Sequence, residues 1–339
     1  MKTVYVGMSG GVDSSVSALL LQEQGYKVVG VYMKNWSRDL PGMKCPWAED
    51  LADAKRVAVR LGIDFEVWDF EEAYREKVVE YMLAEFRKGN TPNPDIMCNQ
   101  EIKFKLFYEK AMEAGADLIA TGHYARTDHV DLLRAVDENK DQTYFLYRIS
   151  EEALRHTLFP IGGMMKPEVK KLAEEKGLHN AYKKESMGVC FVGEVGMKDF
   201  LKEYIEVEPG EIREAETDKV LGYHEGAVFY TIGQRHGLYI SGGMPYYVVK
   251  KDVANNVVYV SKDLNNNNLW IKELKLRNVF VRSETPENVQ VRLRHRAPLI
   301  PATFDGETLK FESKIKRPAA GQSAVLYDGE ICLGGGIIA

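Results

Sequence analysis

Cysteine is scarce in this chain, and the few cysteines lie far apart. The 339 residues include four, Cys45, Cys98, Cys190 and Cys332, and no Cys-x-x-Cys pair occurs. That spacing argues against a zinc or iron–sulfur site built from this chain alone. The sequence therefore predicts no metal centre made of clustered thiols.

An excess of positive charge is also missing. The chain has 45 Lys and Arg against 50 Asp and Glu, for a formal net charge of -5. This balance excludes a polyanion-binding footprint over the whole protein. Any nucleic-acid site must therefore be a local patch on an acidic body.

Long apolar runs are absent too. No segment approaches the roughly 20 apolar residues of a membrane span. Met1 is followed directly by a strand-like run rather than by a basic and then apolar leader. We expect a cytoplasmic protein with no membrane association.

The first part of the chain alternates between strand-like and helix-like segments. β-rich apolar runs occupy residues 3–8, 27–33, 63–70 and 117–122, and helical spacing occupies 13–24, 48–61, 71–88 and about 100–114. Such alternation predicts a parallel sheet with helices on both faces, which binds ligands beyond the carboxyl ends of its strands. We expect these loops to converge there: 9–14, 33–37, 91–98 and 122–124.

The sequence pattern changes after about residue 206. Short β-rich runs are split by Gly, Asn and charged residues, and from about residue 270 only short strands and turns follow. Regular short strands with turn signals predict a small barrel. We expect three domains, at 1–206, 207–270 and 271–339, with the polar stretch 263–268 as the turn between the last two.

A glycine pair joins the first strand to the first helix, in VYVGMSGGVDSSVSALLL, residues 4–21. Glycine lets backbone amides approach an anion closely, and a helix N-terminus and serine hydroxyls add donors. The lysine of a Walker A loop is missing. The residues alone leave open a phosphate-binding loop or a tight turn with a helix N-cap at Asp13 or Ser14.

Eight motifs together resemble one family. They are, in chain order, GMSGGVDSSV, VYMKNW, TPNPDIMCNQEIKF, TGHYAR, KDQTYFL, ESMGVCFVGE, YTIGQRHGL and GQSAVLYDGEICLGGGII. The chain resembles the tRNA-specific 2-thiouridylases over nearly its whole length, and Ser-Gly-Gly-x-Asp-Ser resembles their pyrophosphatase-type P-loop. A Walker lysine is not required there, because the α–β bond of ATP is the one broken.

The resemblance implies an α/β fold and a reaction. The fold is an N-terminal Rossmann-like parallel sheet forming the adenylating domain, a small central domain and a C-terminal β-barrel that contacts tRNA. The reaction is ATP- and Mg²⁺-dependent thiolation of the wobble uridine, position 34, with release of AMP and pyrophosphate. It implies these nucleotide contacts: Gly7, Met8, Ser9, Gly10, Gly11, Val12, Asp13, Ser14, Met33 and Gly122.

Replacing a carbonyl oxygen by sulfur needs a good leaving group and a thiolate. The resemblance implies that Cys190 carries a persulfide from an upstream sulfur donor, that Cys98 is the nucleophile that later pairs with it, and that Asp95 is the general acid/base. From the residues alone, Cys190 could be a buried strand cysteine. Asp95 could be a helix N-cap after Pro94, or could share a helix face with Cys98.

Contacts with tRNA are implied mainly by the resemblance. The matching positions are Asn93, Pro94 and Asp95 at the target base, with His123, Lys140, Asp141, Gln142, Arg294, His295 and Gln322. The residues add one observation: Arg292, Arg294 and Arg296 alternate, so a strand would place all three on one face. Such a stripe suits a phosphate backbone or a solvated edge.

One position departs from the family pattern, and two other functions fit parts of the sequence. Met187 stands where a threonine is usual; it could alter packing near Cys190, and we expect the chemistry to survive. A different P-loop adenylating enzyme would need no paired cysteines, so normal activity of Cys190→Ser would favour it. A tRNA-binding or sulfur-carrying protein without ATP turnover would bind tRNA and release no pyrophosphate.

Overall fold

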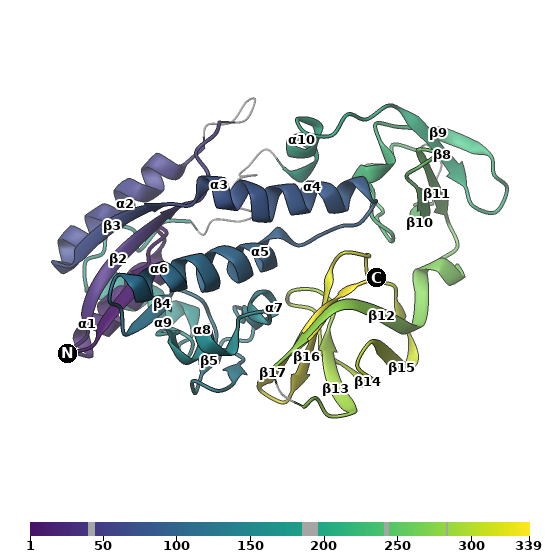
Figure 1. Cartoon of the computed structure of the whole chain (residues 1–339). Coiled ribbons are helices and arrows are strands. Elements are labelled where there is room, and N and C mark those ends of the chain that lie inside the picture. Colours follow the sequence, from purple (N-terminus) through teal and green to yellow (C-terminus); the bar gives the residue numbers. More distant parts are fainter. Residues whose placement is uncertain (40–44, 185–195, 241–243, 283) are drawn as a thin grey trace.

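The computed structural model describes residues 1–39, 45–184, 196–240, 244–282 and 284–339. Cys190 and Met187 lie outside the described residues. Figure 1 shows an N-terminal α/β part, a small sheet beyond the end of α4, and a barrel beside α7. No helix among the described residues is long and apolar enough to cross a membrane.

The N-terminal part is built on a five-stranded parallel sheet, as predicted. Its order is β3-β2-β1-β4-β7, and every recorded pairing is parallel. The strands are β1 Thr3–Gly7, β2 Lys27–Lys34, β3 Asp64–Asp69, β4 Leu118–Thr121 and β7 Thr157–Leu158.

Alternate strand residues face two separate cores. Tyr5 and Val29 belong to one buried cluster, which also contains the buried apolar residues of 70–86 and 96–111, whereas Val4 and Val28 belong to the other. The helices are α1 Val12–Glu23, α2 Trp47–Leu61, α3 Glu71–Tyr74, η1 Arg75–Val79, α4 Glu80–Arg87, α5 Pro94–Met97, η2 Cys98–Leu106, α6 Phe107–Glu113, α7 Thr143–Leu146, α8 Glu151–Arg155, α9 Lys166–Glu175 and α10 Met197–Lys202. The sheet is therefore covered on both faces, because successive apolar side chains of each strand point to opposite faces.

The helix expected from about residue 100 begins earlier. α5 starts at Pro94 and continues through η2, a π-helical stretch, into α6. The Asn93 side chain accepts a hydrogen bond from the Asp95 amide at 3.1 Å, so Asn93 is the N-cap and Pro94 occupies the first turn. The predictions of a loop up to residue 98 and of an N-cap at Asp95 are therefore wrong.

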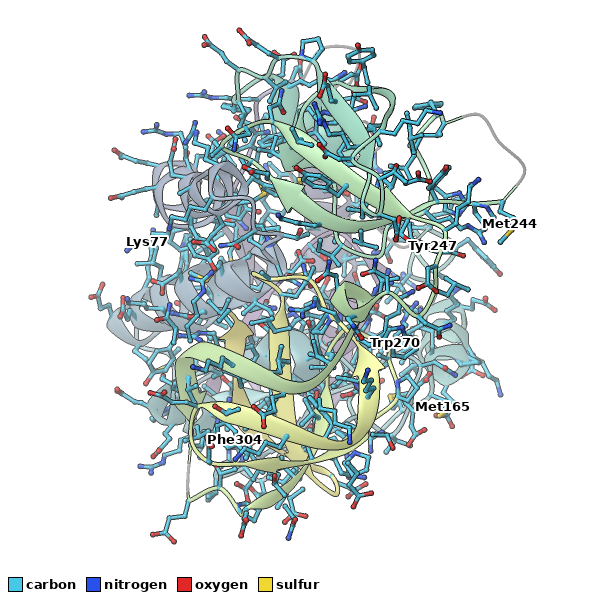
Figure 2. The ribbon with its side chains drawn as sticks, turned by 90° about the vertical axis from the view of Figure 1, so that its right-hand side faces the viewer. Lys77, Met165, Met244, Tyr247, Trp270 and Phe304 are labelled. Carbon is cyan, nitrogen blue, oxygen red and sulfur yellow. The ribbon has the colours of Figure 1, made fainter. Side chains whose placement is uncertain are left out.

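The middle of the chain forms a four-stranded sheet with its own small core. Its order is β10-β11-β8-β9, around buried Ile212, Val248 and Val258. Figure 2 shows this sheet and the barrel as separate units, with Trp270 where the chain passes between them. The elements are β8 Gly210–Glu214, β9 Val220–His224, η3 Ala227–Phe229, β10 Tyr247–Asp252, β11 Val257–Ser261 and η4 Asn267–Leu269.

The C-terminal strands close into an antiparallel barrel. They run in the order β12-β15-β14-β13-β16-β17, and β12 pairs with β17. A Cβ on Gly334 would lie 2.1 Å from the Phe280 carbonyl oxygen, so closure needs glycine there. The strands are β12 Trp270–Val281, β13 Asn288–Arg292, β14 Ile300–Phe304, β15 Thr308–Lys316, β16 Ser323–Asp328 and β17 Ile331–Ile338.

The barrel sheet continues into the N-terminal part of the chain. A short hairpin, β5 Arg126–Thr127 and β6 Leu132–Leu133, extends the barrel sheet through the pair Ile331 and Leu133. Tyr327 and Cys332 belong to the N-terminal core cluster rather than to the barrel's own. The barrel therefore sits directly against the segment that leads from β4 to α8.

Candidate functional site

The loop from Met8 to Gly11 presents amides at the start of α1. Gly11 is the N-cap residue and has no side-chain cap, which leaves first-turn amides available to an anion. Gly10 has φ +76°, and a Cβ there would lie 2.3 Å from the Asp50 carbonyl oxygen. The N-cap alternative for Asp13 or Ser14 is therefore wrong, and the glycine pair sets the shape of the loop.

Hydrogen bonds within the loop hold it as a closed turn. The Ser9 amide donates to Ser14 Oγ at 3.2 Å, and the Ser14 hydroxyl donates to the Gly11 carbonyl at 3.2 Å. From outside the loop, Asn180 Nδ2 donates to the Gly10 carbonyl at 3.0 Å. These bonds fix the shape of the loop.

The other predicted nucleotide residues meet this loop. A Cβ on Gly122, at the carboxyl end of β4, would lie 2.5 Å from the Ser14 amide nitrogen. A Cβ on Gly7 would lie 2.8 Å from Met33 Cε. The structure therefore brings Gly7, Met33 and Gly122 together with the loop at one edge of the sheet.

A buried lysine that the sequence analysis missed reaches the loop. Lys166, at the start of α9, places Nζ 2.7 and 2.8 Å from the two carboxylate oxygens of Asp13. The Tyr124 hydroxyl donates to the same carboxylate at 3.1 Å. The cation absent from the loop sequence is thus supplied by a residue 153 positions away.

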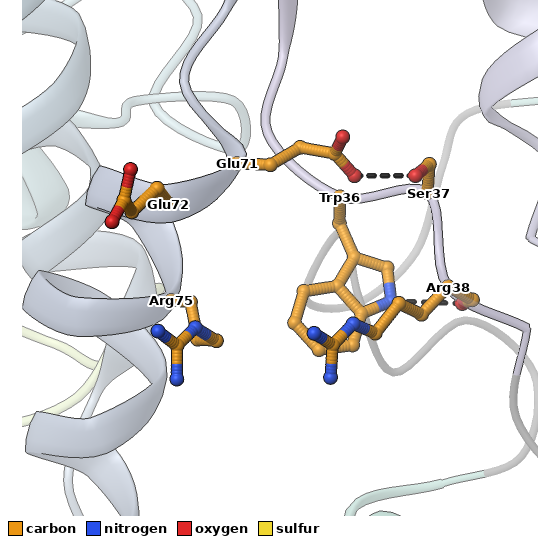
Figure 3. Close-up of a pocket in the computed structure, with 6 residues that line it drawn as sticks. All are labelled: Trp36, Ser37, Arg38, Glu71, Glu72 and Arg75. Atoms are coloured by element: carbon orange, nitrogen blue, oxygen red, sulfur yellow. Dashed lines mark hydrogen bonds between the residues drawn. The ribbon is translucent and has the colours of Figure 1, made fainter.

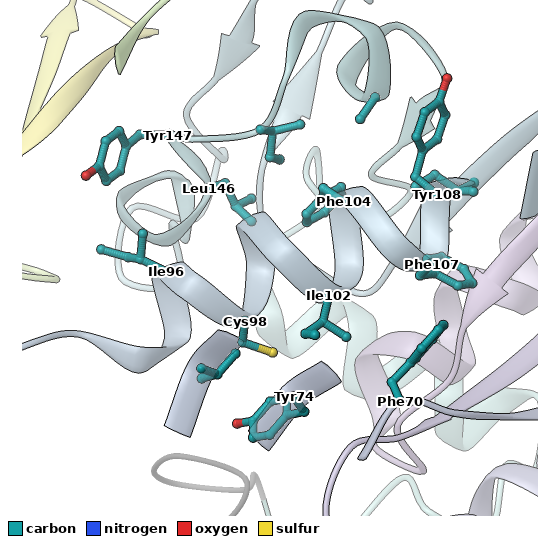
Figure 4. Close-up of a cluster of buried hydrophobic side chains, with 14 of the residues drawn as sticks. Phe70, Tyr74, Ile96, Cys98, Ile102, Phe104, Phe107, Tyr108, Leu146 and Tyr147 are labelled. Carbon is teal, nitrogen blue, oxygen red and sulfur yellow. The ribbon is translucent and has the colours of Figure 1, made fainter. Parts of the chain in front are cut away.

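Asp95 and Cys98 lie near the start of the α5–η2 helix, and Cys98 is 4% exposed. Figure 4 shows its sulfur directed toward Tyr74. Burial raises the pKa of Asp95, and the charge of Lys103 opposes that shift. A carboxyl with a raised pKa is suited to act as a general acid or base.

His123 and Asp141, both predicted to contact tRNA, have buried side chains. The His123 ring lies between Phe104 and Phe159, with Nδ1 2.8 Å from Thr121 Oγ1, and burial holds its pKa well below the usual value. Asp141 is 1% exposed. Both side chains are therefore engaged inside the protein rather than presented to RNA.

The predicted arginine stripe does not form. β13 ends at Arg292, which is 5% exposed and bonds Asp141 Oδ2 at 2.6 Å. Arg294 and Arg296 follow in an exposed turn, and Arg296 has φ +61°. Only the last two arginines are open to an RNA phosphate.

His295 and Gln322 connect the barrel to the cysteine-bearing segment. The His295 ring lies 4.5 Å from that of Phe145, whose carbonyl accepts from Asn99 Nδ2 at 3.2 Å. Gln322 Nε2 donates to the Thr91 carbonyl at 2.7 Å. Burial and the charge of Arg296 lower the pKa of His295 to about 4, so it is neutral at pH 7. The predicted residues of the barrel therefore border the segment 91–99.

A hollow lies just beyond the end of β2. It has a volume of about 320 Å³, and Figure 3 shows Arg38 and Arg75 beside Trp36, with Glu71 bonded to Ser37. Glu71 also pairs with Lys34 at 2.6 Å. The sequence analysis included Trp36 and Ser37 only as part of the loop 33–37 and gave a role to none of the six lining residues, which are Trp36, Ser37, Arg38, Glu71, Glu72 and Arg75.

Known protein families and curated relatives match this sequence over nearly its whole length. Three family models match: "tRNA methyl transferase HUP domain" at residues 2–194, "tRNA methyl transferase PRC-barrel domain" at 198–271 and "Aminomethyltransferase beta-barrel domain" at 266–338. The tRNA-specific 2-thiouridylase MnmA of Pseudomonas fluorescens is 46% identical over 99% of this chain and 94% of its own length. That of Idiomarina loihiensis is 48% identical over 99% and 96%. The chain therefore belongs to the tRNA-specific 2-thiouridylase family.

Proposed function

We propose that this protein replaces the C2 oxygen of uridine 34 in tRNA by sulfur at the expense of ATP. One observation carries the proposal: an anion loop with the Asp13–Lys166 pair follows β1, and the helix that bears Cys98 packs on the same sheet, in the core cluster that also contains Tyr5 and Val29. The first part suits ATP phosphates, and the second suits thiol chemistry.

The first step is adenylation. The uridine O2 attacks the α-phosphorus of ATP, the α–β bond breaks, and pyrophosphate leaves. The amides of the loop and the ammonium of Lys166 would hold the pyrophosphate, because both present positive charge to it. The uridine oxygen thereby becomes part of an AMP leaving group.

The second step transfers sulfur. The outer sulfur of a persulfide on Cys190 attacks C2, the C2–O bond breaks, and AMP departs. Cys98 thiolate then attacks the Cys190 sulfur, which releases the thiouridine and leaves a Cys98–Cys190 disulfide; release of hydrosulfide first would end in the same disulfide. Asp95 would exchange protons with the thiol or the pyrimidine.

Mg²⁺ fits the donor set of the loop. The Asp13 carboxylate stands at the anion site, and Mg²⁺ is commonly held by one or two carboxylates together with phosphate oxygens. When bound, the ion would neutralise phosphate charge. Asp13 would then share its negative charge between the ion and Lys166.

The partners follow from this chemistry. The exposed Arg294 is followed by His295, whose ring packs against Phe145. Together with Lys140 and Asn93, these residues would hold the anticodon arm. A persulfide-carrying protein would reload Cys190. We place the enzyme in the cytoplasm, where tRNA is available and thiols stay reduced.

The test is nucleoside mass analysis of tRNA incubated with the protein, ATP, Mg²⁺ and a persulfide donor. We expect 2-thiouridine to appear only when ATP is present. In one turnover without reductant, peptide mapping should also recover the Cys98–Cys190 disulfide. Unmodified uridine in the complete mixture would refute the function, whereas thiolated tRNA with two remaining thiols would refute only the sulfur-release step.

A further inference from the structure

A buried ion pair links the barrel to the segment that follows β4. Arg292 Nη1 lies 2.6 Å from Asp141 Oδ2, and the two side chains are 6% and 0% exposed. The Arg292 guanidinium also stacks over the Tyr327 ring at 5.3 Å. Such a pair adds little net stability compared with apolar packing, so its value lies in fixing one arrangement of the two parts.

Asp141 uses its carboxylate to shape its own segment. Oδ1 accepts from the Ala135 amide at 3.2 Å and from the Thr143 hydroxyl at 2.9 Å. That hydroxyl lies 3.2 Å from Tyr327 Oη on β16 of the barrel. The carboxylate therefore ties residues 135–143 to the barrel wall at two points.

Gln142, the residue after Asp141, is hydrogen-bonded to Tyr124, which contacts the phosphate loop. Gln142 accepts from the Tyr124 amide at 2.8 Å through Oε1, and its own amide donates to the Tyr124 carbonyl at 2.9 Å. The Tyr124 hydroxyl donates to Asp13, and Lys166 Nζ lies 5.6 Å from the Tyr124 ring centroid. A continuous series of bonded groups thus leads from Arg292 to Asp13.

The barrel end of this series is next to the exposed turn. Arg292 is the last residue of β13, and Arg294 and His295 follow two and three residues later. A ligand that orders this turn would also restrain the position of Arg292. A shift of Arg292 would be passed to Asp13 through Asp141, Gln142 and Tyr124.

We propose that Asp141 is a positioning residue through which tRNA bound at the barrel turn favours the ATP-binding arrangement of the phosphate loop. The inference rests on the proposed sites for tRNA and ATP. It assigns Asp141 a role inside the protein in place of direct contact with RNA. By reciprocity, ATP must also tighten tRNA binding by the same factor.

The experiment measures the affinity of an α,β-methylene ATP analogue with Mg²⁺, by calorimetry, with and without a saturating tRNA transcript. For the unaltered protein we expect tRNA to tighten analogue binding about fivefold or more, within the usual range of coupling between sites. Asp141→Asn and Tyr124→Phe should each bring this factor to about one. Asp141→Asn should change the affinity for either ligand alone much less, because this side chain is buried inside the protein. Tyr124→Phe also removes a bond to Asp13, so it is judged by the coupling factor alone.

Two further variants separate coupling from general damage. The double variant should lose no more coupling than either single one, because both cut the same route. Tyr147→Phe removes a hydroxyl that lies 3.1 Å from Ser323 Oγ at the same interface, off the route, and should keep the factor. A similar fall in melting temperature in all four variants would not explain a factor that is lost in three of them and kept in Tyr147→Phe.

Three results overturn the proposal: a factor of one in the unaltered protein when both ligands bind, a factor that survives in both single variants, or additive losses in the double variant. Failure of the tRNA transcript to bind at all would instead count against the proposed tRNA site. The two failures are therefore distinguishable.

Discussion

The phosphate loop and the junction between barrel and N-terminal sheet are built over very different sequence distances. The bond between the Ser9 amide and Ser14 Oγ spans five positions. The Arg292–Asp141 pair spans 151 positions, and the bond from the Tyr144 hydroxyl to the Ser323 carbonyl spans 179. The backbone turn of the loop therefore rests on its own glycines and serines, with Asn180 and Lys166 added from distant positions. The junction, in contrast, consists only of contacts between two distant parts of the chain.

The two regions also differ in how they treat charge. The loop keeps its Asp13–Lys166 pair close to an open anion site, with Asp13 29% exposed. The junction buries Arg292 and Asp141 almost completely. A change in the loop should therefore affect ligand chemistry first, and a change in the junction should affect stability first.

The largest effect should come from breaking the junction. Arg292→Ala leaves the Asp141 carboxylate buried without its cation, which we expect to lower the free energy of unfolding by about 3–5 kcal/mol. Urea unfolding measures this. Arg294→Ala, exposed two residues away, should change it by no more than about 0.5 kcal/mol. Equal stability of the two variants would contradict the assigned difference in burial.

A substitution in the phosphate loop should lower the rate of the reaction more than the stability of the protein. Asp13→Asn keeps a partner for the Tyr124 hydroxyl but removes the charge that faces Lys166 and the metal. We expect tRNA-dependent pyrophosphate release to fall about 10²-fold or more, as when a charge-stabilising group is lost from an active site, with tRNA affinity nearly unchanged. A variant that released pyrophosphate normally would show that Asp13 lies outside the reaction.

A smaller steric change tests how closely β4 approaches the loop. A methyl group on Gly122 would meet the Ser14 amide at 2.5 Å, so Gly122→Ala should weaken analogue binding by about 1–3 kcal/mol. Gly163→Ala is the matched control, because nothing lies within 4 Å of its Cβ position. If calorimetry gave the same analogue affinity for both variants and the unaltered protein, the loop would be able to move away from the added methyl group without weakening binding.

The smallest effect concerns the exposed turn. Arg294→Ala should reduce the slope of log affinity for tRNA against log salt by roughly 1, the loss of one phosphate contact. Arg75→Ala, an exposed arginine at the Trp36 hollow, provides the comparison. An unchanged slope for Arg294→Ala would remove this residue from the tRNA contact.

The sequence predicted what depends on local pattern. The parallel sheet follows from period and glycine punctuation, and the loop follows from Ser9 to Ser14, because backbone conformation there is set by neighbouring residues. The start of α5 could also have been predicted, since Asn93 followed by Pro94 is a helix-start pattern.

The rest could not be read from local pattern. Arg292 alternates with Arg294 and Arg296, yet β13 ends at Arg292 and Arg292 turns inward to Asp141. Lys166 gives no local sign that it will reach Asp13. Both contacts depend on where distant elements pack, and periodicity carries no information about that.

The central claim is that the oxygen of uridine 34 itself leaves as part of AMP. One turnover of the persulfide-loaded enzyme with tRNA and ATP in ¹⁸O-labelled water tests it most directly, with the AMP analysed by mass spectrometry. The account predicts one unlabelled AMP for each 2-thiouridine, because the added oxygen comes from the tRNA. AMP that carries ¹⁸O in proportion to the thiouridine formed would mean that water cleaves the ATP, and would contradict adenylation of the base.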